Sequence, residues 1–158
     1  DYFSDCVEEV GLDLESKNIK LNFDNLVPDD TIVIADPEQM KRVINNIIGN
    51  SVKYMDKDPS KGQGMIEIRL LDDVDSIRIE IEDNGRGIAA KDLGRIFERF
   101  YRTDSSRNSS RGGSGIGLSI VKKIIEDHGG YIWATSKEGE GTCMHFVLRK
   151  YKEVEKNE

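Results

Sequence analysis

The segment Asp83-Asn84-Gly85-Arg86-Gly87-Ile88 directly follows residues 76–82, in which isoleucines occupy every second position. Such alternation predicts a half-buried β-strand, so Asp83 would emerge at a strand end. The two glycines permit positive φ and let the backbone approach a flat ligand closely. A carboxylate only accepts hydrogen bonds, so Asp83 could hold the exocyclic amine of adenine and would repel the oxygen of guanine. A tight turn with a capping aspartate explains the segment equally well when it is taken alone.

A polar segment, residues 46–54, precedes this turn on a predicted helix. Asp36-Pro37 predicts the start of that helix, with an N-cap aspartate and proline at the first helical position. The polar positions share one helical face at i, i+4, i+7 and i+8: Asn46, Asn50, Lys53 and Tyr54. An asparagine oxygen suits Mg²⁺, and a lysine can neutralise a phosphate. An exposed polar helix face is the plainer alternative.

A third segment, Gly113-Ser114-Gly115-Ile116-Gly117-Leu118, opens a second amphipathic helix predicted for residues 115–128. Backbone N–H groups at a helix start form a phosphate cradle. The spacing matches neither the Rossmann fingerprint nor a Walker A motif, because the chain contains no Gly-Lys dipeptide. Residues 103–111, rich in serine and arginine, predict a mobile lid over the phosphates.

Hydrophobic periodicity predicts the remaining elements. They are an opening helix near residues 3–14, an extended stretch at 19–26, a strand at 31–35, a hairpin of 65–71 with 76–82 through 72–75, and a final hairpin of 131–136 with 142–149. Helices on one side of mostly antiparallel strands predict an α+β, two-layer sandwich.

Together with residues 96–102 and Gly139-Glu140-Gly141-Thr142, the three segments resemble, in order, the N, G1, F, G2 and G3 boxes of the histidine-kinase ATP-binding domain. That family lies within the gyrase, Hsp90 and MutL ATPase superfamily, and the resemblance covers roughly residues 30–149. It implies a Bergerat-type ATP-binding fold, in which helices cover one face of a mixed, mostly antiparallel sheet. It also implies that the chain binds ATP and Mg²⁺.

The resemblance further assigns individual roles to residues of this chain. Asn50 matches the metal ligand and Arg102 an arginine that reaches the terminal phosphate, so these two are the candidate catalytic residues. The matched nucleotide contacts are Asn46, Asn50, Lys53, Tyr54, Asp83, Gly85, Gly87, Ile88, Arg99, Tyr101, Arg102, Gly113, Gly115, Ile116, Gly117, Leu118 and Thr142. Phe97, Phe100 and Tyr101 would hinge the lid, although Phe97 is better explained by core packing. Ser51 stands where alanine is common and Ile116 where leucine is common, and neither is expected to disturb binding.

Asn46 separates the branches of the superfamily. The hydrolytic branches and the anti-sigma serine kinases carry a glutamate general base at this position, and an amide cannot take up a proton at neutral pH. Histidine kinases do not need that base, because their nucleophile is an imidazole on a separate helical domain. His128 and His145 lack the flanking residues of a phosphoacceptor, so we expect both to be structural. An ATP-hydrolysing clamp is disfavoured by Asn46, and a nucleotide-binding module without catalysis by the intact motifs.

The resemblance thus implies transfer of the ATP γ-phosphoryl group to a histidine of a dimerisation and phosphoacceptor domain, followed by relay to a response-regulator aspartate. The expected organisation is a catalytic domain over residues 1–150, with a flexible lid near 98–113, and a polar tail over 151–158. The net charge of −7 argues against a nucleic-acid surface.

No apolar run approaches the ~20 residues that cross a bilayer, so no direct membrane contact is expected from these residues. The resemblance implies a cytoplasmic location, and the start at Asp1 suggests a piece of a longer parent whose anchor, if any, lies elsewhere. Cys6 and Cys143 lack metal-site spacing and are expected to be free thiols.

Overall fold

The computed structural model describes residues 2–55, 62–99, 101 and 117–151 of the 158-residue chain. The strand order in its five-stranded sheet is β1-β2-β3-β5-β4. In chain order the elements are α1 (Tyr2–Ser16), β1 (Ile19–Asn25), α2 (Pro37–Lys53), β2 (Gly64–Asp73), β3 (Ser76–Asp83), α3 (Ala90–Leu93), α5 (Gly117–Asp127), β4 (Ile132–Lys137) and β5 (Gly141–Arg149). Among the strands of the described residues, β1 and β2 alone pair in parallel, which confirms the predicted α+β class and the mixed, mostly antiparallel sheet.

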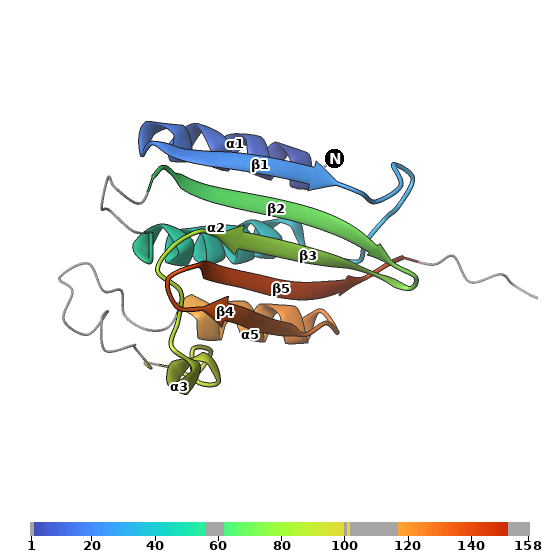
Figure 1. Cartoon of the computed structure of the whole chain (residues 1–158). Coiled ribbons are helices and arrows are strands. Elements are labelled where there is room, and N and C mark those ends of the chain that lie inside the picture. The colour runs from blue at the N-terminus through green and yellow to red at the C-terminus, as the bar shows by residue number, and fades with distance from the viewer. Residues whose placement is uncertain (1, 56–61, 100, 102–116, 152–158) are drawn as a thin grey trace, which may run out of the picture.

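The two faces of the sheet have different chemistry because side chains alternate along each strand. On the inner face Ile66, Ile79 and Ile81 are at most 1% exposed and belong to the hydrophobic core. Full burial of such a side chain stabilises the fold by about 1.5–3 kcal/mol. The helices α1, α2 and α5 cover this face of the sheet (Figure 1). The outer face carries the polar members of the same strands. None of the described helices is both long enough and apolar enough to span a bilayer.

The start of α2 is fixed by two independent contacts. The carboxylate of Asp36 accepts hydrogen bonds from the backbone N–H groups of Glu38 and Gln39 at 2.9 and 3.4 Å, which confirms the predicted N-cap. The backbone N–H of Asp36 in turn donates to Nε2 of His128 at 3.1 Å, while Nδ1 of that ring lies 2.7 Å from the Ile124 carbonyl. His128 therefore ties the end of α5 to the start of α2, in the structural role expected for it.

One predicted strand is wrong. Residues 31–35 form only a single bridge, between Val33 and Lys150. A turn in which Thr31 N–H bonds to the Pro28 carbonyl at 3.0 Å precedes them, and the Asp36 cap follows at once. The isoleucines on either side of Val33 are 62% and 50% exposed, so the alternating pattern does not reflect a buried face here.

Candidate functional site

Four segments of the chain converge at one end of the sheet, on the left in Figure 1. They are the end of α2, the end of β3, the start of α5 and the turn between β4 and β5. These segments contain the N- and G1-like sequences, the last two residues of the G2-like sequence (Gly117 and Leu118) and the G3-like sequence respectively, which are far apart in the chain. The fold therefore brings the predicted site segments together.

Asp83, Thr142 and Ser136 form a row across three adjacent strands at this end. Asp83 of β3 lies directly opposite Thr142 of β5, and Thr142 lies opposite Ser136 of β4. Asp83 is 7% exposed and Thr142 6%, so both polar side chains belong to the edge of the buried core. Buried polar side chains are uncommon and must be hydrogen-bonded, so such a row at the strand ends is a candidate for ligand contact.

The carboxylate of Asp83 is held by several donors. It accepts the Gly85 N–H at 2.9 Å, together with hydrogen bonds from the Ser51 side chain and the Thr142 backbone. Burial raises the pKa of Asp83 above its usual 3.8, and these hydrogen bonds offset only part of that effect. The group is thus a buried, oriented acceptor that a further hydrogen-bond donor would stabilise. Ser51, which the sequence marked only as a departure from alanine, contributes to its orientation.

The structure requires glycine at two positions of the turn after β3, for different reasons. A Cβ on Gly85 would lie 2.5 Å from the carbonyl oxygen of Tyr54, so only glycine lets this loop reach the end of α2. Gly87 has a φ of 75°, which favours glycine, and a Cβ there would lie 2.4 Å from the Lys137 carbonyl oxygen. Both glycines thus allow close approach to the protein's own backbone, and of the two only Gly87 has a positive φ. Close approach to a ligand stays a prediction.

Tyr54 links α2 to the loop after β3. Tyr54 is the C-cap of α2. It therefore lies just beyond the helix and does not extend the polar helical face, as the spacing had predicted it would. Its carbonyl accepts the Arg86 N–H at 3.0 Å, and the Arg86 guanidinium lies 5.2 Å from the ring centroid. The Lys53 ammonium lies 5.9 Å from the centroid of the same ring, and Tyr54 is 8% exposed. These contacts fix the last turn of α2 relative to Asp83.

The charges of two helix ends suit a cation and an anion respectively. Asn46 and Asn50 lie one turn apart on α2, both half-buried, and Asn50 belongs to the last turn, where the helix dipole favours positive charge. The start of α5 at Gly117 provides the opposite, positive pole of a helix dipole, which favours an anion. Both helix ends lie at the site end of the sheet (Figure 1). The donor set therefore fits Mg²⁺ beside Asn50 and phosphate beside Gly117.

The segment before the lid is held by Tyr101. Its hydroxyl donates to the carboxylate of Asp92, which is 6% exposed, and the Arg95 guanidinium lies 4.5 Å from its ring centroid. Phe97 packs against the core, as expected, and Arg99 is exposed.

The remaining predicted contacts divide into buried and undescribed residues. Ile88 is 3% exposed within the core cluster, and Leu118 is partly buried against it. Outside the described residues lie Phe100, Arg102, Gly113, Gly115, Ile116 and most of the predicted lid.

A hollow of about 520 Å³ also touches the end of the row, since Asp83 and Thr142 are among its lining residues. Its other walls include Glu67, Thr135 and Cys143, which belong to the outer face of the sheet. None of its described walls belongs to α2. Ser136 is also among its walls, so the hollow adjoins the whole row and extends from it onto the outer face of the sheet.

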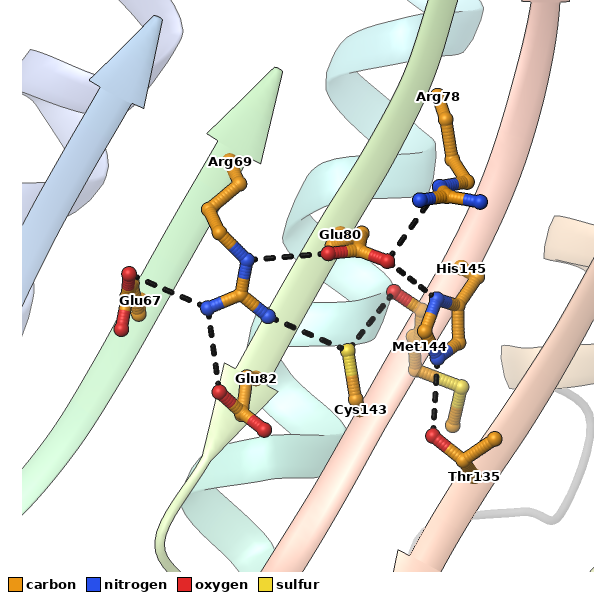
Figure 2. A network of polar contacts seen from close by, with 9 residues as sticks. All are labelled: Glu67, Arg69, Arg78, Glu80, Glu82, Thr135, Cys143, Met144 and His145. Atoms are coloured by element: carbon orange, nitrogen blue, oxygen red, sulfur yellow. Dashed lines mark hydrogen bonds and ion pairs between the residues drawn. The ribbon is translucent and has the colours of Figure 1, made fainter. Parts of the chain in front are cut away.

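A second polar cluster occupies the outer face, on the side of the sheet opposite α2 (Figure 2). Potential ligand atoms of Glu80, Cys143 and His145 lie within 4.8 Å of one another, a set that would suit a zinc ion. However, Arg69 Nε lies 3.0 Å from Glu80, and its Nη2 lies 3.8 Å from the Cys143 sulfur. Burial also raises the pKa of Cys143 to about 12, which keeps the thiol protonated. Arg69 thus supplies the positive charge, and the cluster is a structural network.

This network predicts an acid-sensitive contribution to stability. Burial alone would raise the pKa of Glu80, but hydrogen bonds from Arg69 and His145 lower it below its usual 4.5. Because the unfolded state then binds the proton more readily, the stabilisation is present above pH 4.5 and is lost as the pH falls through the lowered pKa. We expect the free energy of unfolding, from urea denaturation, to fall in this range.

Glu80→Gln should be less stable near neutral pH and should lose part of this acid dependence. Glu8→Gln, on the exposed surface of α1, is the matched control and should behave like the parent. A parallel pH profile for Glu80→Gln and the parent would assign the acid sensitivity to other carboxylates.

Comparison with known proteins adds an independent line of evidence. Residues 35–152 match the family model described as "Histidine kinase-, DNA gyrase B-, and HSP90-like ATPase". The sensor histidine kinase WalK of Bacillus subtilis (strain 168) is 39% identical over 134 residues, which are 85% of this chain and 21% of that protein. The chain therefore spans about a fifth of the length of this curated relative.

Solved structures agree in fold. The mycobacterial sensor histidine kinase MprB matches with a TM-score of 0.76 and 26% identity, covering 94% of this chain and 95% of that chain. The catalytic domain of histidine kinase ThkA matches with a TM-score of 0.74 and 29% identity, covering 93% of each chain. Both matches cover more than nine tenths of this chain.

Proposed function

We propose that this chain, which belongs to the histidine kinase-, DNA gyrase B- and HSP90-like ATPase family and is a sensor-kinase catalytic domain, binds Mg·ATP and transfers the γ-phosphoryl group to a histidine of a separate domain. The observation that carries this proposal is the buried, oriented carboxylate of Asp83 at the junction of α2, α5 and the β4–β5 turn. A response-regulator aspartate would receive the group from that histidine.

Asp83 would select the base. Its carboxylate is an acceptor, its pKa is raised by burial, and donors from the protein already fix its orientation. The exocyclic amine of adenine supplies the missing donor, whereas the oxygen of guanine would face a negative charge. Thr142 lies beside it at the same strand end and would contact the same edge of the base.

The ends of α2 and α5 would hold the phosphates. Asn50 would bind Mg²⁺, with Asn46 and Lys53 beside it, and the backbone at Gly117 would receive phosphate oxygens. When bound, Mg²⁺ neutralises charge on the phosphate chain. Arg102, Gly113 and the other predicted contact residues that lie outside the described part of the chain remain part of the proposal. Catalysis by these groups would consist of positioning and charge neutralisation.

The chemistry of Asn46 and of the two histidines indicates that the acceptor of the phosphoryl group lies outside this chain. Asn46 has no proton affinity suited to a general base. His128 bonds to the Asp36 backbone, and His145 contacts Glu80 at 2.8 Å and Thr135 at 2.9 Å. We therefore propose a dimerisation and phosphoacceptor domain of the same parent as the partner, in the cytoplasm, with no role for nucleic acid or direct membrane contact.

Transfer in trans tests this function. The purified chain should bind Mg·ATP, acquire no stable phosphate, and release phosphate only at background rate. Addition of the parent's helical histidine domain, at high concentration to replace the lost tether, should give acid-labile label on that domain. Radiolabelled ATP followed by separation of the two polypeptides measures both products. Label on this chain itself, or brisk phosphate release without the partner, would favour an ATP-hydrolysing clamp instead.

A further inference from the structure

Ser136 has three polar partners at the site. Its Oγ lies 2.8 Å from the Ile88 backbone nitrogen, 2.9 Å from the Gly141 carbonyl oxygen and 2.8 Å from the Thr142 hydroxyl oxygen. The residue thus joins β4 to the loop after β3 and to the first two residues of β5. Neither its type nor its position drew attention in the sequence.

The proton positions in this network follow from the chemistry of its members. The Gly141 carbonyl can only accept, so the single proton of Ser136 is directed there. The Ile88 N–H can only donate, and it fills one lone pair of Ser136. The contact between the two hydroxyls must then be donated by Thr142, which fills the other lone pair. Because its proton is directed to Ser136, the Thr142 hydroxyl can only accept a hydrogen bond on its other side.

We propose that Ser136 is a positioning residue for base specificity, which fixes the Thr142 hydroxyl as a hydrogen-bond acceptor next to Asp83. This inference rests on the proposed nucleotide function. Asp83 and Thr142 lie directly opposite on adjacent strands and are 7% and 6% exposed, so a ligand meets both at once. An exocyclic amine has two N–H groups and can give one to each.

Without Ser136, the hydroxyl of Thr142 is free to rotate and donate. It could then satisfy an acceptor on a base, such as the oxygen of guanine, at one of the two positions. With Ser136 in place, both positions repel such an acceptor. The serine therefore changes which base edge is accepted, without having to touch the base.

The test measures the affinity of the purified chain, with Mg²⁺, for ATP, for GTP and for purine riboside triphosphate, which lacks the amine. The parent should prefer ATP to both. Ser136→Ala should reduce the preference for ATP over purine riboside triphosphate roughly three- to tenfold, the range for one neutral hydrogen bond. Ser136→Thr keeps the hydroxyl and should restore the preference. Thr135→Ala, the outward-facing neighbour on β4, is the control and should leave it unchanged.

A double-mutant cycle separates this role from simple support of the loop. In a Thr142→Val background, Ser136→Ala should cause no further loss of base preference, because the oriented group is already absent. Equal weakening of all three nucleotides by Ser136→Ala would show that the serine is only structural, and an unchanged preference would also overturn the proposal. If Ser136→Ala does not fold by circular dichroism, Ser136→Cys carries the same expectation. Failure of the parent to bind any nucleotide would instead refute the proposed function.

Discussion

Asp83→Asn is expected to lower the affinity for ATP by roughly ten- to a hundredfold while the fold survives. The amide keeps the shape of the side chain and can still accept the Gly85 N–H, which the carboxylate accepts at 2.9 Å. It loses the charge of a buried acceptor, and a charge-assisted hydrogen bond is worth about 1.5–3 kcal/mol. Its NH₂ group can also turn toward the adenine amine, where two donors would meet. Calorimetric titration with ATP and GTP measures both affinity and selectivity.

Glu82→Gln is the matched control. Glu82 directly precedes Asp83 in the chain, but its side chain points to the outer face and pairs with Arg69 at 3.1 Å. It should bind ATP like the parent. The parent should also lose affinity at acidic pH, since burial raises the pKa of Asp83 above 3.8 and protonation removes the negative charge and adds a donor that would face the adenine amine. That acid loss should be absent in Asp83→Asn. Parent-like ATP affinity in this variant would reduce Asp83 to a turn residue.

Asn50→Ala is expected to abolish the part of ATP binding that depends on Mg²⁺. Asn50 lies in the last turn of α2, whose position is fixed by the contacts of Tyr54 with Arg86, so no other α2 side chain can take over its place. Loss of an outer-shell partner typically lowers metal affinity about 10- to 100-fold, and loss of the ligand itself should exceed this. Titrations in Mg²⁺ and in EDTA should therefore give the same ATP affinity for the variant.

The control is Asn45→Ala, since Asn45 is an exposed asparagine of the same helix that lies on a different face from Asn50. It should retain the full difference between Mg²⁺ and EDTA, and both variants should keep the helical signal of the parent. A normal Mg²⁺ effect in Asn50→Ala would move the metal ligand elsewhere in the site.

Local signals predicted much of the fold. The Asp36-Pro37 pair marks the beginning of α2 because capping and proline geometry act within one turn. The two hairpins follow from alternation and from short turns. The register of β4 with β5 could also have been predicted from the sequence. Once residues 131–136 pair with 142–149, Ser136 falls opposite Thr142, as observed. The signal for Ser136 was thus present in the predicted hairpin.

Contacts between distant segments had no such signal. The parallel pairing of β1 with β2 and the bond from the Asp36 N–H to His128 depend on packing of the whole domain. The hydrogen bond from Tyr101 to Asp92 likewise needs the path of the chain after α3. Residues 31–35 show the opposite error: the alternating pattern predicts a strand, but the segment pairs with the chain only at the single bridge to Lys150.

The row of Asp83, Thr142 and Ser136 lies at the ends of strands that form the middle and one side of the sheet. Side chains there have already lost their rotational freedom during folding, so recognition of the base requires almost no further loss of conformational entropy. Whatever ordering accompanies nucleotide binding would then be associated with the phosphate end. Such a division lets one domain retain a constant base preference while the release rate of its nucleotide is adjusted through other residues.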